Sequence, residues 1–261
     1  MRRTHPPLED DLPVVSTAIH AGHELRAEIA DAIAVDAGTR LREEDPYTDR
    51  VIRGIGSTVA VDRSRFEVDL NREREAAVYV DPSDAWGLEL WRAPLPDEVV
   101  ERSREEHDAF YRTMATKLDE LADDGPFLVL DVHSYNHRRG GPAAPPAPIA
   151  ESPEVNVGTG TLDRRRWGRL VDRFITQLER CEVRGHPLDV RENVRFRGGH
   201  LSRWVNQRYG QHGCALAIEL KKTFMDEWTG ELDDGHLDEL RAALHRAVTE
   251  TVDGLSAMVP R

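Results

Sequence analysis

The sequence predicts an α/β fold in which a mixed central sheet is flanked by helices. Short runs rich in apolar residues alternate along the chain with longer segments whose apolar residues recur at helical spacing. The chain has 261 residues, which is enough to bury one large core, and it contains no internal repeat. We therefore interpret residues 1–261 as a single domain, with residues 1–13 as an extended tail.

Most of the predicted strands read as buried on both faces, because they are short apolar runs without polar alternation. They span residues 14–19, 58–62, 66–70, 127–132, 155–157 and 214–220. The predicted helices span residues 23–35, 96–122, 162–181, 200–209 and 236–258. In the last of them, Leu237, Leu240, Leu244 and Val248 recur at helical spacing and form one apolar stripe. The stretch 140–148 is rich in Gly and Pro and is a predicted loop.

The charge balance and the cysteine content limit the classes of partner. The chain carries 48 acidic and 35 basic residues, for a net charge of −13, so we expect no binding to nucleic acid. No apolar run approaches the roughly 20 residues that a membrane-spanning helix needs, so we expect no membrane partner. The start of the chain lacks the apolar stretch of a signal peptide, and Cys181 and Cys214 are its only cysteines. These observations predict a cytoplasmic protein.

Polar side chains follow several predicted strands at the point where each strand ends. His20, Asn71, Arg72 and His133 stand at such ends, and ligands of α/β folds gather at the carboxyl ends of strands. Neutral imidazole and carboxylate oxygen are ligands that zinc prefers, although a histidine at a strand end is more often structural. Glu219 lies inside an apolar run, where a carboxylate is normally excluded. The pattern therefore favours a polar site at one sheet edge.

Several sequence blocks, taken together and in this order, resemble those of the N-formylglutamate amidohydrolase family. Each block is short, but the Asp-Leu-Asn-Arg and Asp-x-His-Ser blocks are specific in combination. The resemblance covers roughly residues 14 to 230. The blocks are His20-Ala21-Gly22, Thr48-Asp49, residues 64–72 (SRFEVDLNR), Asp131-Val132-His133-Ser134, residues 193–200 (NVRFRGGH) and Glu219-Leu220.

This resemblance implies a zinc-dependent amidohydrolase. It implies a phosphorylase/hydrolase-like domain, similar to zinc carboxypeptidases and aspartoacylases, that holds one divalent ion, Zn²⁺. His20, Asp49 and His133 match the positions of the metal ligands, and Glu219 matches that of the general base. A metal ion polarises the amide carbonyl and activates water, while a carboxylate moves the proton to the leaving nitrogen. The alternative, non-catalytic role for Glu219 is a structural ion pair.

The resemblance also implies residues that bind the substrate. Asn71 and Arg72 resemble a pair that holds a substrate carboxylate, for which the arginine fork is suited. Arg65 could polarise the scissile carbonyl or hold a second carboxylate. Arg197 and His200 flank Gly198-Gly199, which either brings backbone close to the substrate or makes the tight turn that opens the helix from His200.

Departures from the family pattern leave two questions open. Asp49 is followed by Arg50 where a tryptophan is common, so Glu24 could replace or supplement Asp49, and Glu44 and Asp45 are also near. The substrate is predicted to be a small N-acyl amino acid, with N-formyl-L-glutamate as the first choice. The alternatives are a carboxypeptidase-like or aspartoacylase-like hydrolase acting on another carboxylated amide, and a non-catalytic binding protein of the same fold. The sequence does not set the oligomeric state.

Overall fold

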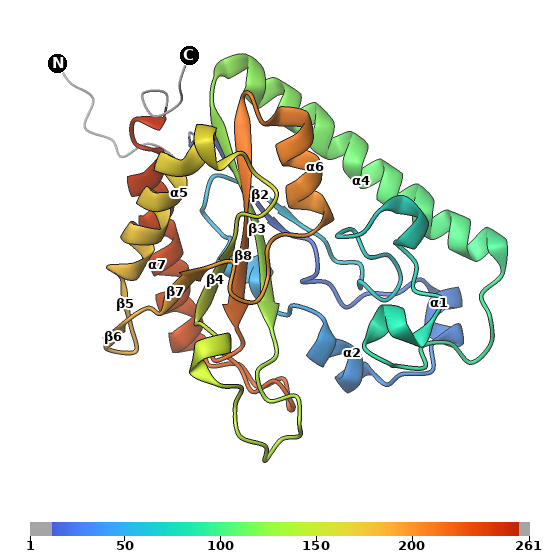
Figure 1. The fold of residues 1–261 in the computed structure, drawn as a ribbon. Coiled ribbons are helices and arrows are strands. Elements are labelled where there is room, and N and C mark those ends of the chain that lie inside the picture. Colours follow the sequence, from blue (N-terminus) through green and yellow to red (C-terminus); the bar gives the residue numbers. More distant parts are fainter. Residues whose placement is uncertain (1–11, 256–261) are drawn as a thin grey trace.

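A six-stranded mixed sheet forms the centre of the protein (Figure 1). The structure is a computed structural model, and it describes residues 12–255. The strands are ordered β2-β1-β3-β8-β4-β7 across the sheet. Neighbours are parallel except for β4 and β8, which are antiparallel. The bounds are β1 Val14–Ala18, β2 Ser57–Ala60, β3 Phe127–Tyr135, β4 Val155–Gly158, β7 Val190–Glu192 and β8 Gly213–Lys221.

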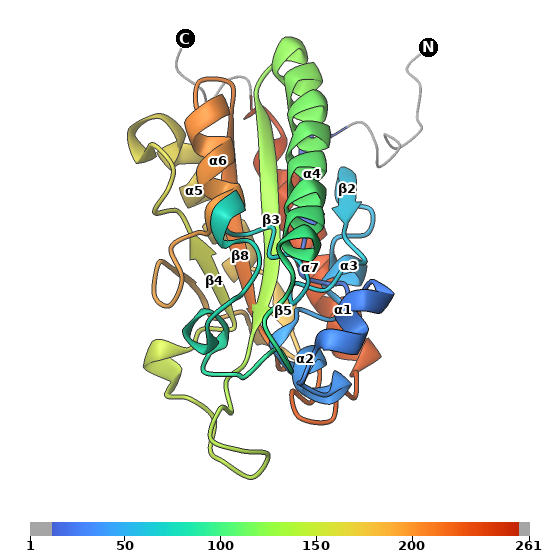
Figure 2. The ribbon, with the colours of Figure 1, turned by 90° about the vertical axis from the view of Figure 1, so that its right-hand side faces the viewer.

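Helices cover both faces of this sheet (Figures 1 and 2). The α-helices are α1 Ala27–Ala32, α2 Ala37–Glu43, α3 Thr48–Val51, α4 Asp97–Asp124, α5 Arg164–Glu179, α6 His200–Tyr209 and α7 Asp234–Val252. Short 3₁₀ turns are η2 Arg74–Ala76, η3 Pro82–Ala85 and η4 Ile149–Glu151, and β5 Glu182–Val183 pairs with β6 His186–Pro187. None of the helices within residues 12–255 is both long and apolar enough to cross a membrane.

Alternation along the central strands divides the core into two parts. Leu128, Leu130 and Val132 of β3 belong to the larger cluster, which includes α5 and α7. Phe127 and Val129 belong to a second cluster, on the α4 and α6 side. The strand β8 alternates in the same way, because its residues 214, 216, 218 and 220 join the larger cluster. Asp131, His133 and Glu219 therefore continue the second face, at the carboxyl ends of their strands.

The predicted α/β fold with a mixed sheet and flanking helices is confirmed. One predicted strand is wrong, because residues 66–70 form turns. Glu67 and Asp69 are buried there beside alternating apolar residues, so both sides of the segment are buried. The backbone closes locally instead, with Glu67 N–H donating to Ser64 O at 3.0 Å and Arg72 N–H donating to Asp69 O at 3.2 Å. Within the predicted helix 23–35, only α1 is helical.

The observed ends of the other elements differ from the predicted ends by a few residues, which is common for helix and strand ends. The strand β3 runs three residues beyond the predicted end at Val132, which carries it through His133. The last helix ends at Val252 rather than at Met258, and Met258 lies outside the described residues. Neither α2 nor α3 was predicted, and the loop between them contains Asp45.

Candidate active site

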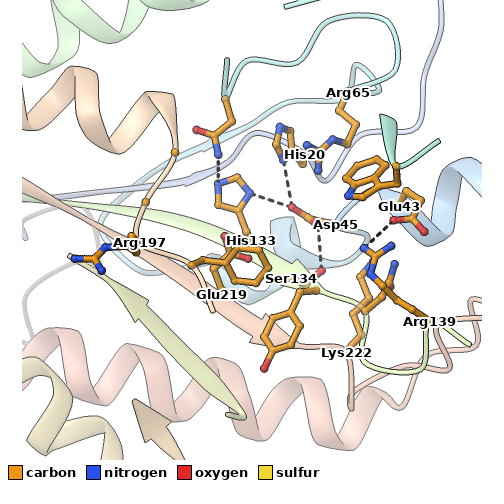
Figure 3. Close-up of a pocket in the computed structure, with 17 residues that line it drawn as sticks. His20, Glu43, Asp45, Arg65, His133, Ser134, Arg139, Arg197, Glu219 and Lys222 are labelled. Atoms are coloured by element: carbon orange, nitrogen blue, oxygen red, sulfur yellow. Dashed lines mark hydrogen bonds and ion pairs between the residues drawn. The ribbon is translucent and has the colours of Figure 1, made fainter. Parts of the chain in front are cut away.

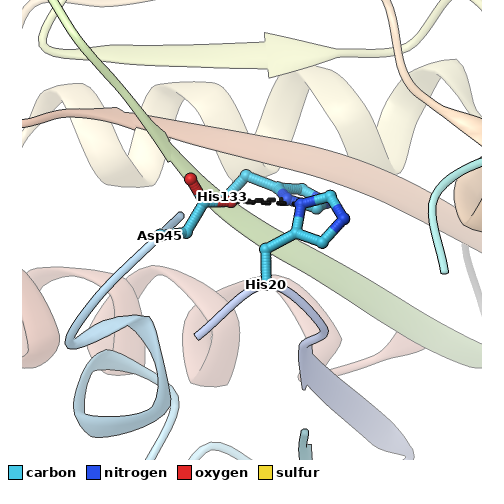
Figure 4. A group of neighbouring side chains, drawn as sticks. All are labelled: His20, Asp45 and His133. Carbon is cyan, nitrogen blue, oxygen red and sulfur yellow. Dashed lines mark hydrogen bonds and ion pairs between the residues drawn. The ribbon is translucent and has the colours of Figure 1, made fainter. Parts of the chain in front are cut away.

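Three potential metal-ligating side chains converge at the carboxyl ends of β1 and β3 (Figure 4). His20 follows β1, His133 lies within β3, and Asp45 comes from the loop between α2 and α3. Each offers a ligand atom within 4.8 Å of the other two, and all three residues are buried. Asp45 Oδ2 lies 3.0 Å from His133 Nδ1 and 3.4 Å from His20 Nδ1. The two Nδ1 atoms therefore face the same carboxylate oxygen.

Two further carboxylates hold the far sides of the imidazole rings. His20 Nε2 lies 2.7 Å from Asp69 Oδ1, and His133 Nε2 lies 2.9 Å from Asp131 Oδ1. An Nε2–H that donates to a carboxylate leaves Nδ1 as the lone-pair nitrogen, and histidine ligands of metals are commonly oriented in this way. His20 Nδ1 is buried and makes no hydrogen bond within the described part of the chain.

This donor set fits a divalent cation such as zinc. Two imidazole nitrogens and one carboxylate are a common set in catalytic zinc sites, which keep a fourth position open. The buried Nδ1 of His20 would gain a partner on binding a cation, which removes the cost of leaving it unsatisfied. Burial opposes the charge of Asp45, but the neighbouring His133 and His20 rings hold its pKa well below its ordinary value. The carboxylate is thus ionised, as a metal ligand must be.

The structure does not bring Asp49, the expected third ligand, together with the two histidines. Asp49 lies in α3, where its Oδ2 is 3.3 Å from Arg53 Nη2 and its side chain is 35% exposed. Asp49 does not line the pocket, whereas Asp45 in the preceding loop lies beside both histidines. The alternative Glu24 is also outside the group, because it is exposed and its backbone bridges to Arg63. Asp45, four positions upstream of Asp49 in the same acidic stretch, is the carboxylate that lies beside the histidines.

Glu219 lies beside the three ligand candidates. It is opposite His133 in the register of β3 and β8, and it follows Ala215 and Ala217 on the same face. Small residues on this face leave room above the strand. Its carboxylate accepts no hydrogen bond from any residue between 12 and 255, and it lines the central pocket. Burial raises the pKa of Glu219 to about 7. A carboxyl group with a pKa near neutrality is suited to accept and return a proton.

The pocket has a volume of about 250 Å³ and opens over the histidines (Figure 3). That is below the roughly 300–1,000 Å³ typical of pockets for drug-sized ligands, so it suits a small molecule. Figure 3 shows Arg197 and Arg139 at opposite sides, with His133, Asp45 and Glu219 between them. The other lining residues are His20, Glu43, Arg65, Asn71, Trp86, Ser134, Tyr135, Asn136, Phe196, Gly198, Gly199 and Lys222.

Three of the predicted substrate-site residues line this pocket. Arg65 donates to Asp69 Oδ2 at 3.0 Å and to the Tyr79 hydroxyl at 3.1 Å. Asn71 places its amide nitrogen 3.4 Å from His133 Nε2, and its Oδ1 accepts from Leu201 N–H at 3.0 Å. The Arg197 guanidinium is exposed and makes no hydrogen bond or ion pair with the residues that the structure describes. Figure 3 shows this guanidinium at the edge of the pocket and directed away from His133 and Glu219, so Arg197 is a cation at the rim that these residues do not neutralise.

Arg72 and His200 do not line the pocket. The Arg72 guanidinium donates to Asp84 O at 2.5 Å and lies 3.4 Å from Asp69 Oδ2. His200 begins α6, with its Nδ1 3.2 Å from Glu73 Oε1. The two side chains are thus engaged with Asp84, Asp69 and Glu73 and do not enter the pocket.

Sequence reasoning missed Lys222, which is fully buried. Its Nζ donates to the carbonyl oxygens of Arg42 and Glu44, each at 2.7 Å. These bonds fix the backbone directly before Asp45. Burial lowers the pKa of Lys222 to about 8. The composition could have drawn attention to Lys222, because the chain has only three lysines, Lys117, Lys221 and Lys222.

Comparisons with known proteins were made on both sequence and fold. The family model described as N-formylglutamate amidohydrolase matches residues 12–225. A crystal structure of N-formylglutamate amidohydrolase from Ralstonia eutropha aligns with a TM-score of 0.72 and 19% identity, covering 93% of this chain and 93% of that one. The structure of a gene product from Agrobacterium tumefaciens aligns with a TM-score of 0.66 and 15% identity, covering 94% and 92% of the two chains.

The more remote comparisons add little. A metallo-carboxypeptidase from Burkholderia cenocepacia aligns with a TM-score of 0.40 and 15% identity, covering 93% of this chain and 57% of that one. No curated protein matches the chain in sequence. At identities of 19% and 15%, the structures from Ralstonia eutropha and Agrobacterium tumefaciens show that the fold is shared.

Proposed function

Because the chain belongs to the N-formylglutamate amidohydrolase family, we propose that it hydrolyses the amide bond of a small N-acyl amino acid with the help of a divalent metal ion. N-formyl-L-glutamate is the first substrate to test, and zinc is the first metal. His20, Asp45 and His133 would hold the ion, which when bound polarises the amide carbonyl and acidifies water. The observation that carries the proposal is the Glu219 carboxylate beside that ligand set, which accepts no hydrogen bond from residues 12–255.

Glu219 acts as the proton carrier in this proposal. It accepts a proton from the attacking water and delivers it to the leaving amine nitrogen. Its pKa of about 7 keeps both forms accessible near neutral pH. Glu219 and His133 are register partners on the neighbouring strands β8 and β3, and both line the pocket. The base would therefore lie beside the amide carbonyl of a bound substrate.

The other polar residues of the pocket orient the substrate. Arg65 is a buried cation near the histidines, and we assign it the role of stabilising negative charge on the carbonyl oxygen. Arg197 can bind a substrate carboxylate through its fork, and Asn71 adds a neutral donor. Asp69 and Asp131 keep the histidine rings in place.

Turnover of a panel of N-acyl amino acids by the zinc-loaded protein tests this function. We expect amine release by the unchanged protein and by Asp49→Asn, whose side chain lies outside the pocket. Asp45→Asn should lose most activity because a neutral amide is a poor zinc ligand. Zinc-loaded protein that binds the panel but releases no amine would indicate a binding protein and would contradict the proposal.

A further inference from the structure

Trp86 presents an exposed indole at the rim of the pocket. It lines the pocket and is 47% exposed, although large apolar side chains are usually covered. Its backbone has a φ of 55°, in the left-handed region that a bulky residue rarely adopts, and Gly87 follows with a φ of 87°. Such backbone conformations persist where the surrounding structure enforces them, and they concentrate at functional sites.

Several contacts hold this indole in place. Phe66 packs against the ring edge at a centroid distance of 6.4 Å, and the Arg65 guanidinium lies 5.0 Å from the ring centroid. On the other side of the loop, Arg72 donates to Asp84 O at 2.5 Å. Asp84 Oδ2 in turn accepts from the backbone N–H groups of Val80 and Asp81, each at 3.1 Å, which closes the turn before Trp86.

The indole N–H of Trp86 differs from those of three other tryptophans. Trp91, Trp167 and Trp228 each donate their indole N–H to a backbone carbonyl, whereas within residues 12–255 the N–H groups of Trp86 and Trp204 have no such partner, and of these two only Trp86 lines the pocket. Buried or half-buried Trp side chains normally find a partner for this group. The ring therefore offers both an apolar face and an unused donor to whatever enters the pocket.

The two ends of the pocket differ in the charge that they can offer. Arg197 lies at one side, where no described residue pairs with its guanidinium, and Arg139 lies at the other (Figure 3). The Arg139 guanidinium is already paired with Glu43 at 3.1 Å, and it lies 5.8 Å from the Trp86 ring centroid. Arg65 at the same end is paired with Asp69. The Arg197 end therefore suits a carboxylate, while the Trp86 end suits a neutral group.

We propose that Trp86 is a specificity-determining residue that contacts the acyl group of the substrate. This inference rests on the proposed function, because an N-acyl amino acid has a neutral acyl group on one side of the amide bond and its α-carboxylate, with the γ-carboxylate of a glutamate, on the other. The indole forms the wall of the acyl end, and Arg72 positions it through Asp84. The size of the acyl group that is preferred then depends on Trp86, while recognition of the carboxylate does not.

Calorimetric binding of N-formyl-, N-acetyl- and N-butyryl-glutamate tests this assignment in a Glu219→Gln background, which prevents turnover. A methylene packed on an apolar wall changes affinity by about two- to fourfold. We expect the ratio of the formyl to the butyryl Kd to change at least about fivefold on Trp86→Ala. Trp86→Phe should change it less, because an aromatic face remains. The control Val80→Ala alters an exposed residue of the same loop outside the pocket and should leave the ratio unchanged.

The outcomes separate this inference from the proposed function. The assignment of Trp86 would be overturned if the ratio of the formyl to the butyryl Kd is unchanged in zinc-replete Trp86→Ala. It would also be overturned if Trp86→Ala no longer discriminates between a substrate acid and its amide. Glutamates that bind the unchanged protein without being hydrolysed would contradict the proposed function but leave the Trp86 comparison valid. If none of these compounds binds the unchanged protein, both proposals are overturned.

Discussion

The two faces of the central strands contrast sharply at their carboxyl ends. On one face, Leu130 and Val132 of β3 join Leu216 and Ile218 of β8 in a fully buried apolar layer beneath α5 and α7. On the other face, the same strands carry Asp131, His133 and Glu219 beside a pocket. One face therefore supplies stability while the other bears polar groups that need partners. A strand can therefore anchor a reactive site on one face while different residues of the same strand stabilise the core on the other.

The largest expected effect falls on the reactive face. Glu219→Gln keeps the shape of the side chain but removes its ability to accept a proton, so turnover should fall by roughly 10²- to 10⁴-fold. Zinc content should stay close to that of the unchanged protein, because the amide side chain occupies the same space on β8. Steady-state kinetics of metal-replete protein measure the effect, and near-normal turnover would exclude Glu219 as the base.

The apolar face should show the opposite behaviour. Leu216 is fully buried against the α5 and α7 layer, so Leu216→Ala should lower the free energy of unfolding by about 2–5 kcal/mol. The zinc affinity and the KM of the folded fraction should change little, since the cavity opens on the far face from His133. Denaturant titration together with kinetics well below the unfolding midpoint checks this. A large change in KM would show that the two faces are coupled.

A third comparison separates the two arginines that were predicted to bind substrate. Arg197→Ala should reduce kcat/KM for a free acid by about tenfold to a hundredfold and remove the preference for the acid over its amide, because a charge-assisted pair is lost. Arg72→Ala should retain that preference, since its guanidinium is engaged with Asp84 and Asp69. The ratio of kcat/KM for acid and amide measures this. The reverse result would place the carboxylate at Arg72.

The smallest expected effect is the amount by which the buried Glu219 carboxylate lowers the free energy of unfolding of the metal-free protein. Burial raises the pKa of Glu219 to about 7 from its ordinary value near 4.5, so the folded state binds this proton more tightly than the unfolded chain. Stability from this group is therefore present at low pH and lost as pH rises from about 4.5 to 7. Glu219→Gln should stabilise the apo protein by about 1–3 kcal/mol above pH 7 and by less at pH 5. Equal effects at both pH values would contradict this.

The sheet and the longer helices were predictable because their signals are local. The runs that became β1, β3 and β8, and the periodic segments that became α4 and α6, each bury their own apolar residues. The family resemblance found in short blocks is confirmed by the family model. Residues 66–70 failed as a strand because Glu67 and Asp69 find distant partners, Arg26 and His20, that no local pattern reveals.

The site was predictable only in part for the same reason. His20, His133 and Glu219 stand at strand ends or within apolar runs, which marks them in the sequence. Asp45 lies in a loop between two short helices, and its position depends on bonds from Lys222, which is far along the chain. A choice between Asp45 and Asp49 therefore required the tertiary structure.

Zinc content decides whether His20, Asp45 and His133 form the metal centre. The unchanged protein, Asp45→Ala and Asp49→Ala would be dialysed against Zn²⁺ and analysed for metal by mass spectrometry, with circular dichroism as a check of folding. We predict about one ion per chain in the unchanged protein and in Asp49→Ala, and far less in Asp45→Ala, because an incomplete ligand set binds zinc weakly. Full zinc occupancy in Asp45→Ala, or loss of zinc in Asp49→Ala, would contradict the site.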